Sequence, residues 1–182
     1  MLPTGHIAAG FLTAHALIKI LKPDLDASQV NQLLAFGAFW GFAPDLDVFY
    51  SFARQKNLLV SHKDTPNHHK FFFHAPVSWL APGLLIFIFG GLDYTKIFGL
   101  VLWLASWSHF LLDSVEYGIM WLWPFNRKIY ALSRREEGFR IEDKNFFKHS
   151  FKFLYLYSKR ISFYLEILII LIATYFIIQI YR

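Results

Sequence analysis

The sequence has no cysteine and few charged residues. Because none of its 182 residues is Cys, both disulfide bonds and thiolate zinc sites are excluded, and any metal must be held by His and carboxylates. Charged residues make up only 17% of the chain, whereas 55% is hydrophobic and 20% aromatic. This composition is too apolar for an ordinary soluble domain and predicts a membrane protein.

Long apolar runs predict several membrane-spanning helices. The clearest is 161–181, which is long enough to cross a hydrocarbon core of roughly 30 Å and contains Glu166 as its only acidic residue. Further candidate spans are 33–52, 75–92 and 97–121, for which a buried helical core is the alternative. We therefore expect an all-α fold, namely a multi-pass helical membrane bundle of about four to five helices.

Positive charge is concentrated late in the chain. Residues 126–160 hold ten Lys and Arg against four acidic residues, so the positive-inside rule places them in the cytoplasm. The chain then divides into a membrane-embedded core (1–125), a basic cytoplasmic segment (126–160) and a C-terminal transmembrane helix (161–182). Membrane lipids and a cytoplasmic protein docked on the basic segment are the expected partners. Nucleic acid is not expected, because topology and lipid headgroups account for the charge.

Capping residues predict where the first two helices begin. Thr4 is the expected N-cap of a helix over 5–21, and Asp26 or Ser28 is the expected cap of a helix over 29–43. His and Asp residues then recur at the ends of the apolar segments. The candidate metal ligands are His6, Asp45, Asp47, His69, His74, His109 and Asp113.

Two of these clusters carry most of the argument for a metal site. His109 and Asp113 are four residues apart, so their side chains share one helix face and can converge on one point. Asp45 and Asp47 lie in a strongly apolar context, where bare carboxylates are costly to bury without a cation. The alternative is a solvated Asp113 beside a hydrogen-bonded His109, with His74 as a helix cap.

Alternating helix directions place all these clusters at one end of the bundle. With this topology, fourteen of the Lys and Arg residues fall at that end of the bundle and four at the other. By the positive-inside rule, we expect the site to face the cytoplasm. His15 lies about half a turn out of phase with His6, so we expect it to be a packed or interfacial residue rather than a ligand.

The ligand types predict the metal and its chemistry. His with Asp and no sulfur suits zinc first, with manganese behind it, and so many ligands indicate two divalent ions that share a carboxylate. Such a site activates water at neutral pH and stabilises the oxygens of an in-line displacement, which suits phosphoester hydrolysis. We assign catalysis to Asp45, His69, His109 and Asp113, with Lys70 as an anion clamp.

These motifs together resemble a known family. An early His6, a Gly-rich apolar helix ending in the Pro-Asp-Leu-Asp of 44–47, the His-basic-x-x-x-His of 69–74, the His-x-x-x-Asp of 109–113 and the Trp-Pro-Phe of 123–125 are similar to the bacterial membrane-bound metal-dependent hydrolases. That family is also described as LexA-binding, inner membrane-associated hydrolases. The resemblance covers roughly residues 1–130 and implies a hydrolase of the inner membrane.

The pattern is also similar to zinc-dependent phospholipase C, an all-helical enzyme with a three-zinc site. That resemblance implies metal ligands at His6, Asp45, His69, His109 and Asp113. The chain departs from the bacterial family at Lys70, Phe73 and Ala75, where Arg and a flanking Thr or Ser are usual. It also departs from the phospholipase after Asp113, where further His and Glu ligands find no match, so two ions are expected rather than three.

The same residues fit two other functions. A non-enzymatic membrane protein would use the metal to staple the helix ends and the basic segment to dock a partner or anionic lipid. A metal or proton transporter would need ionisable residues near the bilayer midplane, whereas the candidates here cluster at helix ends.

Overall fold

The structure is a computed structural model that describes residues 1–47, 71–133 and 145–182. Within these ranges every regular element is a helix, and the only β pairing is an isolated bridge between Ile119 and Tyr130. The elements are α1 (Pro3–Leu21), α2 (Ala27–Phe42), η1 (Ala43–Leu46), η3 (Phe72–His74), α4 (Val77–Phe89), α5 (Asp93–Asp113), α6 (Phe146–Tyr157) and α7 (Ile161–Tyr181). The predicted all-α helical bundle is confirmed.

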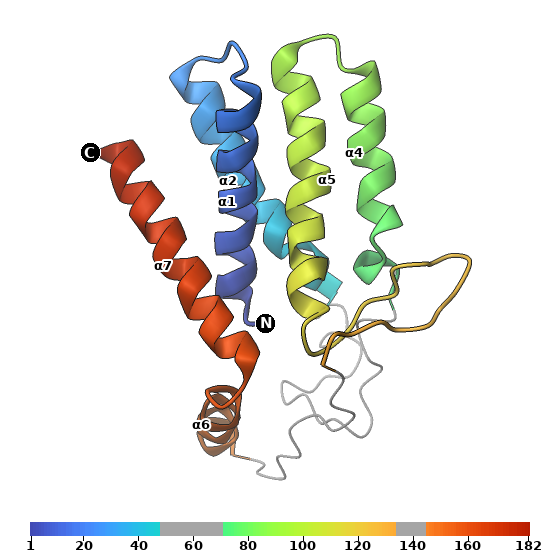
Figure 1. The fold of residues 1–182 in the computed structure, drawn as a ribbon, viewed down its shortest axis with the longest axis vertical. Coiled ribbons are helices and arrows are strands. Elements are labelled where there is room, and N and C mark those ends of the chain that lie inside the picture. Colours follow the sequence, from blue (N-terminus) through green and yellow to red (C-terminus); the bar gives the residue numbers. More distant parts are fainter. Residues whose placement is uncertain (48–70, 134–144) are drawn as a thin grey trace.

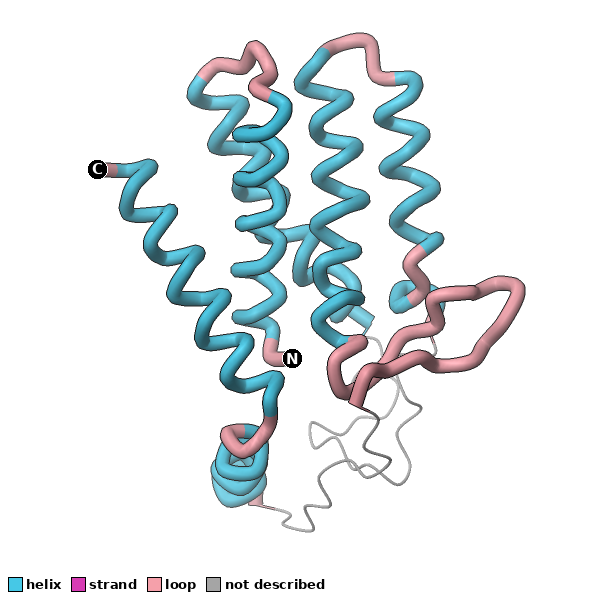
Figure 2. The backbone as a smooth tube through the Cα atoms, viewed as in Figure 1, coloured by secondary structure: helices cyan, strands magenta, loops and turns pink. Residues whose placement is uncertain are grey.

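α1, α5 and α4 run along the long axis of the molecule, and α2 passes obliquely behind α1 (Figure 1). α1 packs on α2, α4 packs on α5, and α5 contacts both α1 and α2. α7 packs against α1 from the outside and is inclined to it, while α6 lies below α7 and is seen almost end-on (Figure 2). The α1–α2 and α4–α5 turns share one end of the bundle. The N-terminus, η1, η3 and the end of α5 share the other, which we call the lower end.

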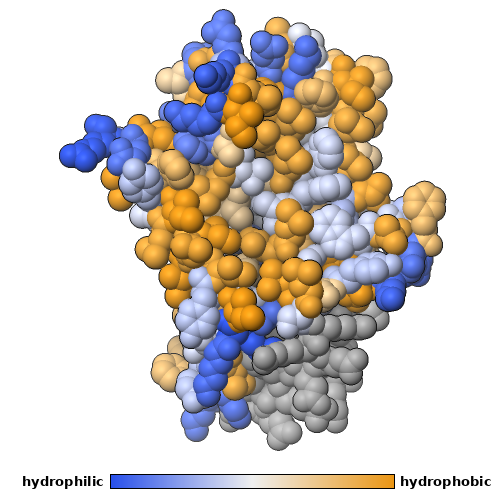
Figure 3. Space-filling model, viewed as in Figure 1, coloured by the Kyte–Doolittle hydropathy of each residue, from blue (hydrophilic) through white to orange (hydrophobic). Residues whose placement is uncertain are grey.

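Three helices, α1, α5 and α7, are long and apolar enough to cross a membrane. Apolar side chains form a broad belt around the middle of the visible face, with polar residues above and below it (Figure 3). The span predicted at 161–181 coincides with α7, whereas α2 and α4 are shorter than the predicted spans 33–52 and 75–92. α2 ends at Phe42 because Pro44 cannot supply the N–H that would continue an α-helix, and η1 follows instead.

The starts of α1 and α2 are stabilised differently. Asp26 caps α2 as predicted, in a reciprocal capping box: its carboxylate accepts from the Gln29 N–H at 2.8 Å, and the Gln29 side chain accepts from the Asp26 N–H at 3.1 Å. The prediction that Thr4 caps α1 is wrong. The N-cap is Leu2, which makes no side-chain cap, and the Thr4 hydroxyl donates to Glu166 on α7 at 2.6 Å.

Glu166 takes over the capping of α1 from across the interface. Its carboxylate accepts from the backbone N–H groups of Leu2 at 3.3 Å and Gly5 at 3.1 Å, and from the hydroxyl of Tyr157 at the end of α6. A Cβ on residue 5 would lie 2.8 Å from Glu166 Cγ, so only glycine admits the carboxylate this closely. A negative charge at a helix N-terminus is favourable, and this contact fixes α7 beside the first turn of α1.

Glycines let α1 and α2 cross in backbone contact. A Cβ at Gly10 would lie 2.1 Å from the Gly37 carbonyl oxygen, and one at Gly41 would lie 2.3 Å from the His6 carbonyl oxygen. The close crossing therefore depends on glycine, which has no side chain, at these positions. It brings the first turns of α1 against the last turn of α2, immediately before η1.

Candidate metal centre

Side chains from four separate elements meet at the lower end of the bundle. α1 supplies His6, η1 and the residue after it supply Asp45 and Asp47, η3 supplies His74, and α5 supplies His109 and Asp113. All are buried except Asp45, whose side chain is 12% exposed. The placement of these clusters at one end of the bundle is as predicted.

The His109 ring is oriented by the backbone of α2. Its Nδ1 lies 2.9 Å from the carbonyl oxygen of Gly41, which can only accept a hydrogen bond, so Nδ1 carries the proton. The lone pair is then on Nε2, which is 3.3 Å from Asp113 Oδ2 and 3.6 Å from Asp45 Oδ1. Nε2 is buried and has no hydrogen-bond partner among the described residues. This is the tautomer that a metal ligand needs.

The His74 ring is oriented by Asp47. Nδ1 lies 2.7 Å from Asp47 Oδ2, and Nε2 lies 3.5 Å from Asp45 Oδ1. A carboxylate on the outer nitrogen of an imidazole is the common support of a metal-binding His, because it fixes the ring and raises its basicity. Asp47, one of the predicted ligands, is therefore placed behind His74, outside the group of donors that face one another.

Two tryptophans hold η3 in position. The Trp79 indole donates to the Phe73 carbonyl at 2.7 Å, and the Trp107 indole donates to the Pro76 carbonyl at 3.0 Å. Trp79 lies on α4 and Trp107 on α5, so the segment carrying His74 is attached to both helices. Buried backbone carbonyls need such donors, and here they also determine where His74 lies.

The two groups outside the spanning helices titrate as an ion pair. Burial alone would raise the pKa of Asp45, but the hydrogen bond to His74 and the nearby histidines lower it to about 2. Burial alone would lower the pKa of His74, but its contacts with Asp45 and Asp47 raise it to about 9. Without a metal, a proton on His74 therefore supplies the positive charge that these carboxylates need.

Four donors meet the distance requirement for one metal ion. One ligand atom each from Asp45, His74, His109 and Asp113 lies within 4.8 Å of all the others. Zinc bonds of about 2.0–2.1 Å place tetrahedral ligands about 3.4 Å apart. The distances are similar here: 3.3 Å from His109 Nε2 to Asp113 Oδ2, and 3.5 and 3.6 Å from Asp45 Oδ1 to the Nε2 atoms of His74 and His109. A cluster of this composition could therefore bind a metal ion.

His6 lies on the outer side of Asp113. Its ring stacks on that of His109 with centroids 3.7 Å apart, and its Nε2 lies 3.3 Å from Asp113 Oδ1. Neither ring nitrogen has a hydrogen-bond partner among the described residues. Asp113 thus directs Oδ2 to His109 and Oδ1 to His6. The Met1 amine nitrogen lies 2.7 Å from the same Oδ1.

The remaining predicted residues are not in this group. His69 and Lys70 lie outside the described residues. His15, which we expected to be packed, lies against Phe176 of α7 with ring centroids 4.6 Å apart, away from the cluster. Four positioning groups were not predicted: the Gly41 carbonyl, the Trp79 indole, the Trp107 indole and Glu166. For Glu166 a signal existed, since it is the only acidic residue in the final span.

Comparison with known protein families identifies the chain. Its residues 1–182 match the family described as YdjM inner membrane protein. The chain belongs to this family. Comparison with curated proteins and with solved structures gives no significant match. Membership of the YdjM family agrees with the three apolar helices α1, α5 and α7, and makes this chain a bacterial inner membrane protein.

Proposed function

We propose that the chain is a membrane-bound, metal-dependent hydrolase of phosphoesters, with lipid-derived phosphoesters as its substrates. One observation carries this proposal: four donors from three elements, three of them buried, face one another at ligand distances, and each of the two imidazoles is supported through its outer nitrogen. Carboxylates in such a site need a compensating positive charge, which a metal ion would supply in place of the proton on His74.

Each residue has a defined role in the proposed site. Asp45, His74, His109 and Asp113 would hold one divalent ion, with zinc favoured and manganese second. A second ion would be held by His6, His69 and the outer oxygen of Asp113, where it would replace the Met1 amine. Asp47 would orient His74, and Lys70 would bind the phosphate. When bound at these residues, a metal would lower the pKa of a coordinated water at neutral pH and would stabilise the charge that develops on the phosphoryl oxygens.

The position of the cluster favours a substrate at the membrane surface. The donors sit at the lower ends of two spanning helices, α1 and α5, so they lie at the level where lipid headgroups begin. Fourteen of the eighteen Lys and Arg belong to the loops and segments at this end, which supports a cytoplasmic orientation. Positive charge near the site would also attract a phosphorylated substrate.

The test is phosphodiesterase activity of the full-length protein in detergent, with zinc or manganese added. Purified wild type is assayed with bis(p-nitrophenyl) phosphate and with a phospholipid, beside Asp45→Ala and His109→Ala. We expect the activity of both variants to fall to background while thermal melting shows a folded protein. His15→Ala is the matched control, because it removes the same side chain from a position away from the cluster, and it should keep its activity.

The same experiment separates hydrolysis from a purely structural metal. Full activity in Asp45→Ala and His109→Ala would contradict the proposed site. A wild type that binds metal and turns over neither substrate class, while both variants lose thermal stability, would favour the non-enzymatic function in which the metal staples the helix ends.

A further inference from the structure

Helix α6 exposes most of its large apolar side chains. Phe147 is 81% exposed, Phe151 is 79% exposed and Tyr155 is 58% exposed. Phe147 and Phe151 are four residues apart and Leu154 follows three later, so the three share one side of the helix. Exposed aromatic residues concentrated on one helix face indicate a binding surface rather than scattered surface residues.

The C-terminal end of α6 is attached to the bundle. Tyr157 is buried, and its hydroxyl donates to Glu166, the residue that caps α1. Phe153 stacks on Tyr157 with ring centroids 5.9 Å apart. The N-terminus of α6 is capped by the Asn145 side chain, which accepts from the N–H groups of Phe147 and Lys148. The helix is therefore a defined element that is capped at its N-terminus and anchored to α7 at its C-terminal end.

α6 lies across the direction of the spanning helices. It is seen almost end-on in Figures 1 and 2, whereas α7 is seen from the side, and only residues 158–160 separate the two helices. α7 is the least buried of the three candidate spans, since only 17% of the residues in its apolar stretch are buried. The exposed face of α6 therefore lies next to the point where α7 enters the membrane, at the level of the headgroups.

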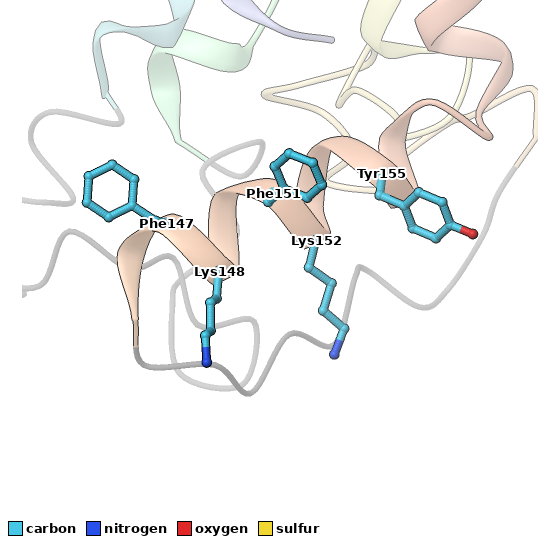
Figure 4. Close-up of a pocket in the computed structure, with 5 residues that line it drawn as sticks. All are labelled: Phe147, Lys148, Phe151, Lys152 and Tyr155. Atoms are coloured by element: carbon cyan, nitrogen blue, oxygen red, sulfur yellow. The ribbon is translucent and has the colours of Figure 1, made fainter.

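Lysines flank the aromatic face. Figure 4 shows Lys148 and Lys152 extending from one side of α6, with the rings of Phe147 and Phe151 on the other side in that view. Together with Tyr155 these residues line a shallow surface groove. Residues 145–165 contain no acidic residue, and Lys159 and Arg160 add positive charge at the junction with α7.

We propose that α6 is an interfacial helix that binds the anionic headgroups of the membrane that α7 spans. Phe147, Phe151 and Leu154 insert at the boundary between headgroups and acyl chains, and Lys148 and Lys152 bind lipid phosphates. An anionic membrane surface is favoured over another protein because the aromatic face adjoins the exposed apolar surface of α7 and because the lysines complement anionic lipid. The inference is independent of the proposed hydrolase activity.

The absence of cysteine makes a direct test possible. Full-length Phe151→Cys carrying a nitroxide is reconstituted into vesicles of phosphatidylcholine, with or without phosphatidylglycerol. Collision rates with oxygen and with a water-soluble nickel chelate report whether the label is in lipid or in water. A label at Asp24→Cys, an exposed position at the opposite end of the bundle, is the aqueous reference.

We expect a severalfold higher oxygen-to-nickel ratio at residue 151 than at residue 24 in vesicles containing phosphatidylglycerol. Adding Lys148→Gln and Lys152→Gln should remove most of this excess in those vesicles. Lys19→Gln with Lys22→Gln, an equal charge change at the opposite end, should leave the ratio unchanged. Circular dichroism of each labelled protein verifies that the helices are intact.

Three results would overturn the proposal. Nickel access at residue 151 equal to that at residue 24 would show that the face is in water. Protection from both reagents would show that protein covers the face, either a second copy or another chain. An unchanged ratio in the double lysine variant would show that anionic headgroups are not what holds α6 in place.

Discussion

At the residue scale, the candidate site is determined by what lies behind each histidine. The Nδ1–H of His109 donates a hydrogen bond to the Gly41 carbonyl, and His74 faces Asp47 through Nδ1, so both Nε2 atoms are directed toward Asp45. Two rings from different elements are thus held in complementary orientations before any ion arrives. Such support reduces the reorganisation that metal binding requires.

Asp47→Asn tests this support without removing a donor from the group of four. The amide keeps the shape of the side chain but loses its charge, so His74 becomes less basic and less firmly oriented. We expect the metal affinity to fall roughly 10–100-fold, measured by competition with a chelator of known affinity. Asp26→Asn, the same change in the capping box at the other end of α2, should leave the affinity unchanged, and equal affinities in all three proteins would contradict the role of Asp47.

The sequence predicted the four donor residues, but not which of the two aspartates in 44–47 faces them and which supports His74. The four-residue spacing of His109 and Asp113 on a helix predicts that they converge, and in the structure they do. Asp45 and Asp47 lie in one tetrapeptide with the same surroundings in sequence, so nothing local distinguishes the donor from the residue behind His74. That distinction arises only when η3 packs beside η1, which brings together residues 27 positions apart.

At the scale of the helices, glycines bring the donors within reach of one another. α1 and α2 touch through Gly10, Gly37 and Gly41, which places His6 against the ring of His109. The apolar runs predicted these helices and their order. The close crossing of α1 and α2 was not predicted. The sequence of an apolar run does not tell whether its glycines contact another helix backbone or face lipid.

Gly10→Ala should separate α1 from α2, because its Cβ would lie 2.1 Å from the Gly37 carbonyl oxygen. Overpacking of this kind costs about 1–3 kcal/mol, so we expect a lower melting temperature in detergent together with weaker metal binding. Gly91→Ala is the matched control, since nothing lies within 4 Å of its Cβ. Equal melting temperatures for the two variants would contradict the backbone contact described here.

At the scale of the whole molecule, the candidate site lies at the same end of the bundle as the described Lys and Arg of residues 126–133 and 145–160. The α1–α2 and α4–α5 turns occupy the other end, with Lys22 and Lys96 near them. Helix order and the distribution of Lys and Arg were enough to predict this polarity from the sequence. α6 was not predicted as a separate helix, because its alternating aromatic and basic residues were included in one basic segment.

The orientation in the membrane is tested by cysteine labelling in intact bacteria. Single cysteines at Asp24→Cys and Lys128→Cys mark the two ends, and both positions are exposed. We expect a membrane-impermeant maleimide applied to spheroplasts to label residue 24 at once and residue 128 only after the membrane is opened. The reverse pattern would place the candidate site outside the cytoplasm.

Metal binding at the lower end of the bundle is tested by metal stoichiometry. Elemental mass spectrometry is applied to full-length protein purified in detergent without chelator, as wild type, His109→Ala and His15→Ala. We predict about two zinc or manganese ions per chain in wild type and His15→Ala, falling sharply in His109→Ala. Wild-type protein that contains no metal, even after reconstitution with several divalent ions, would contradict the account.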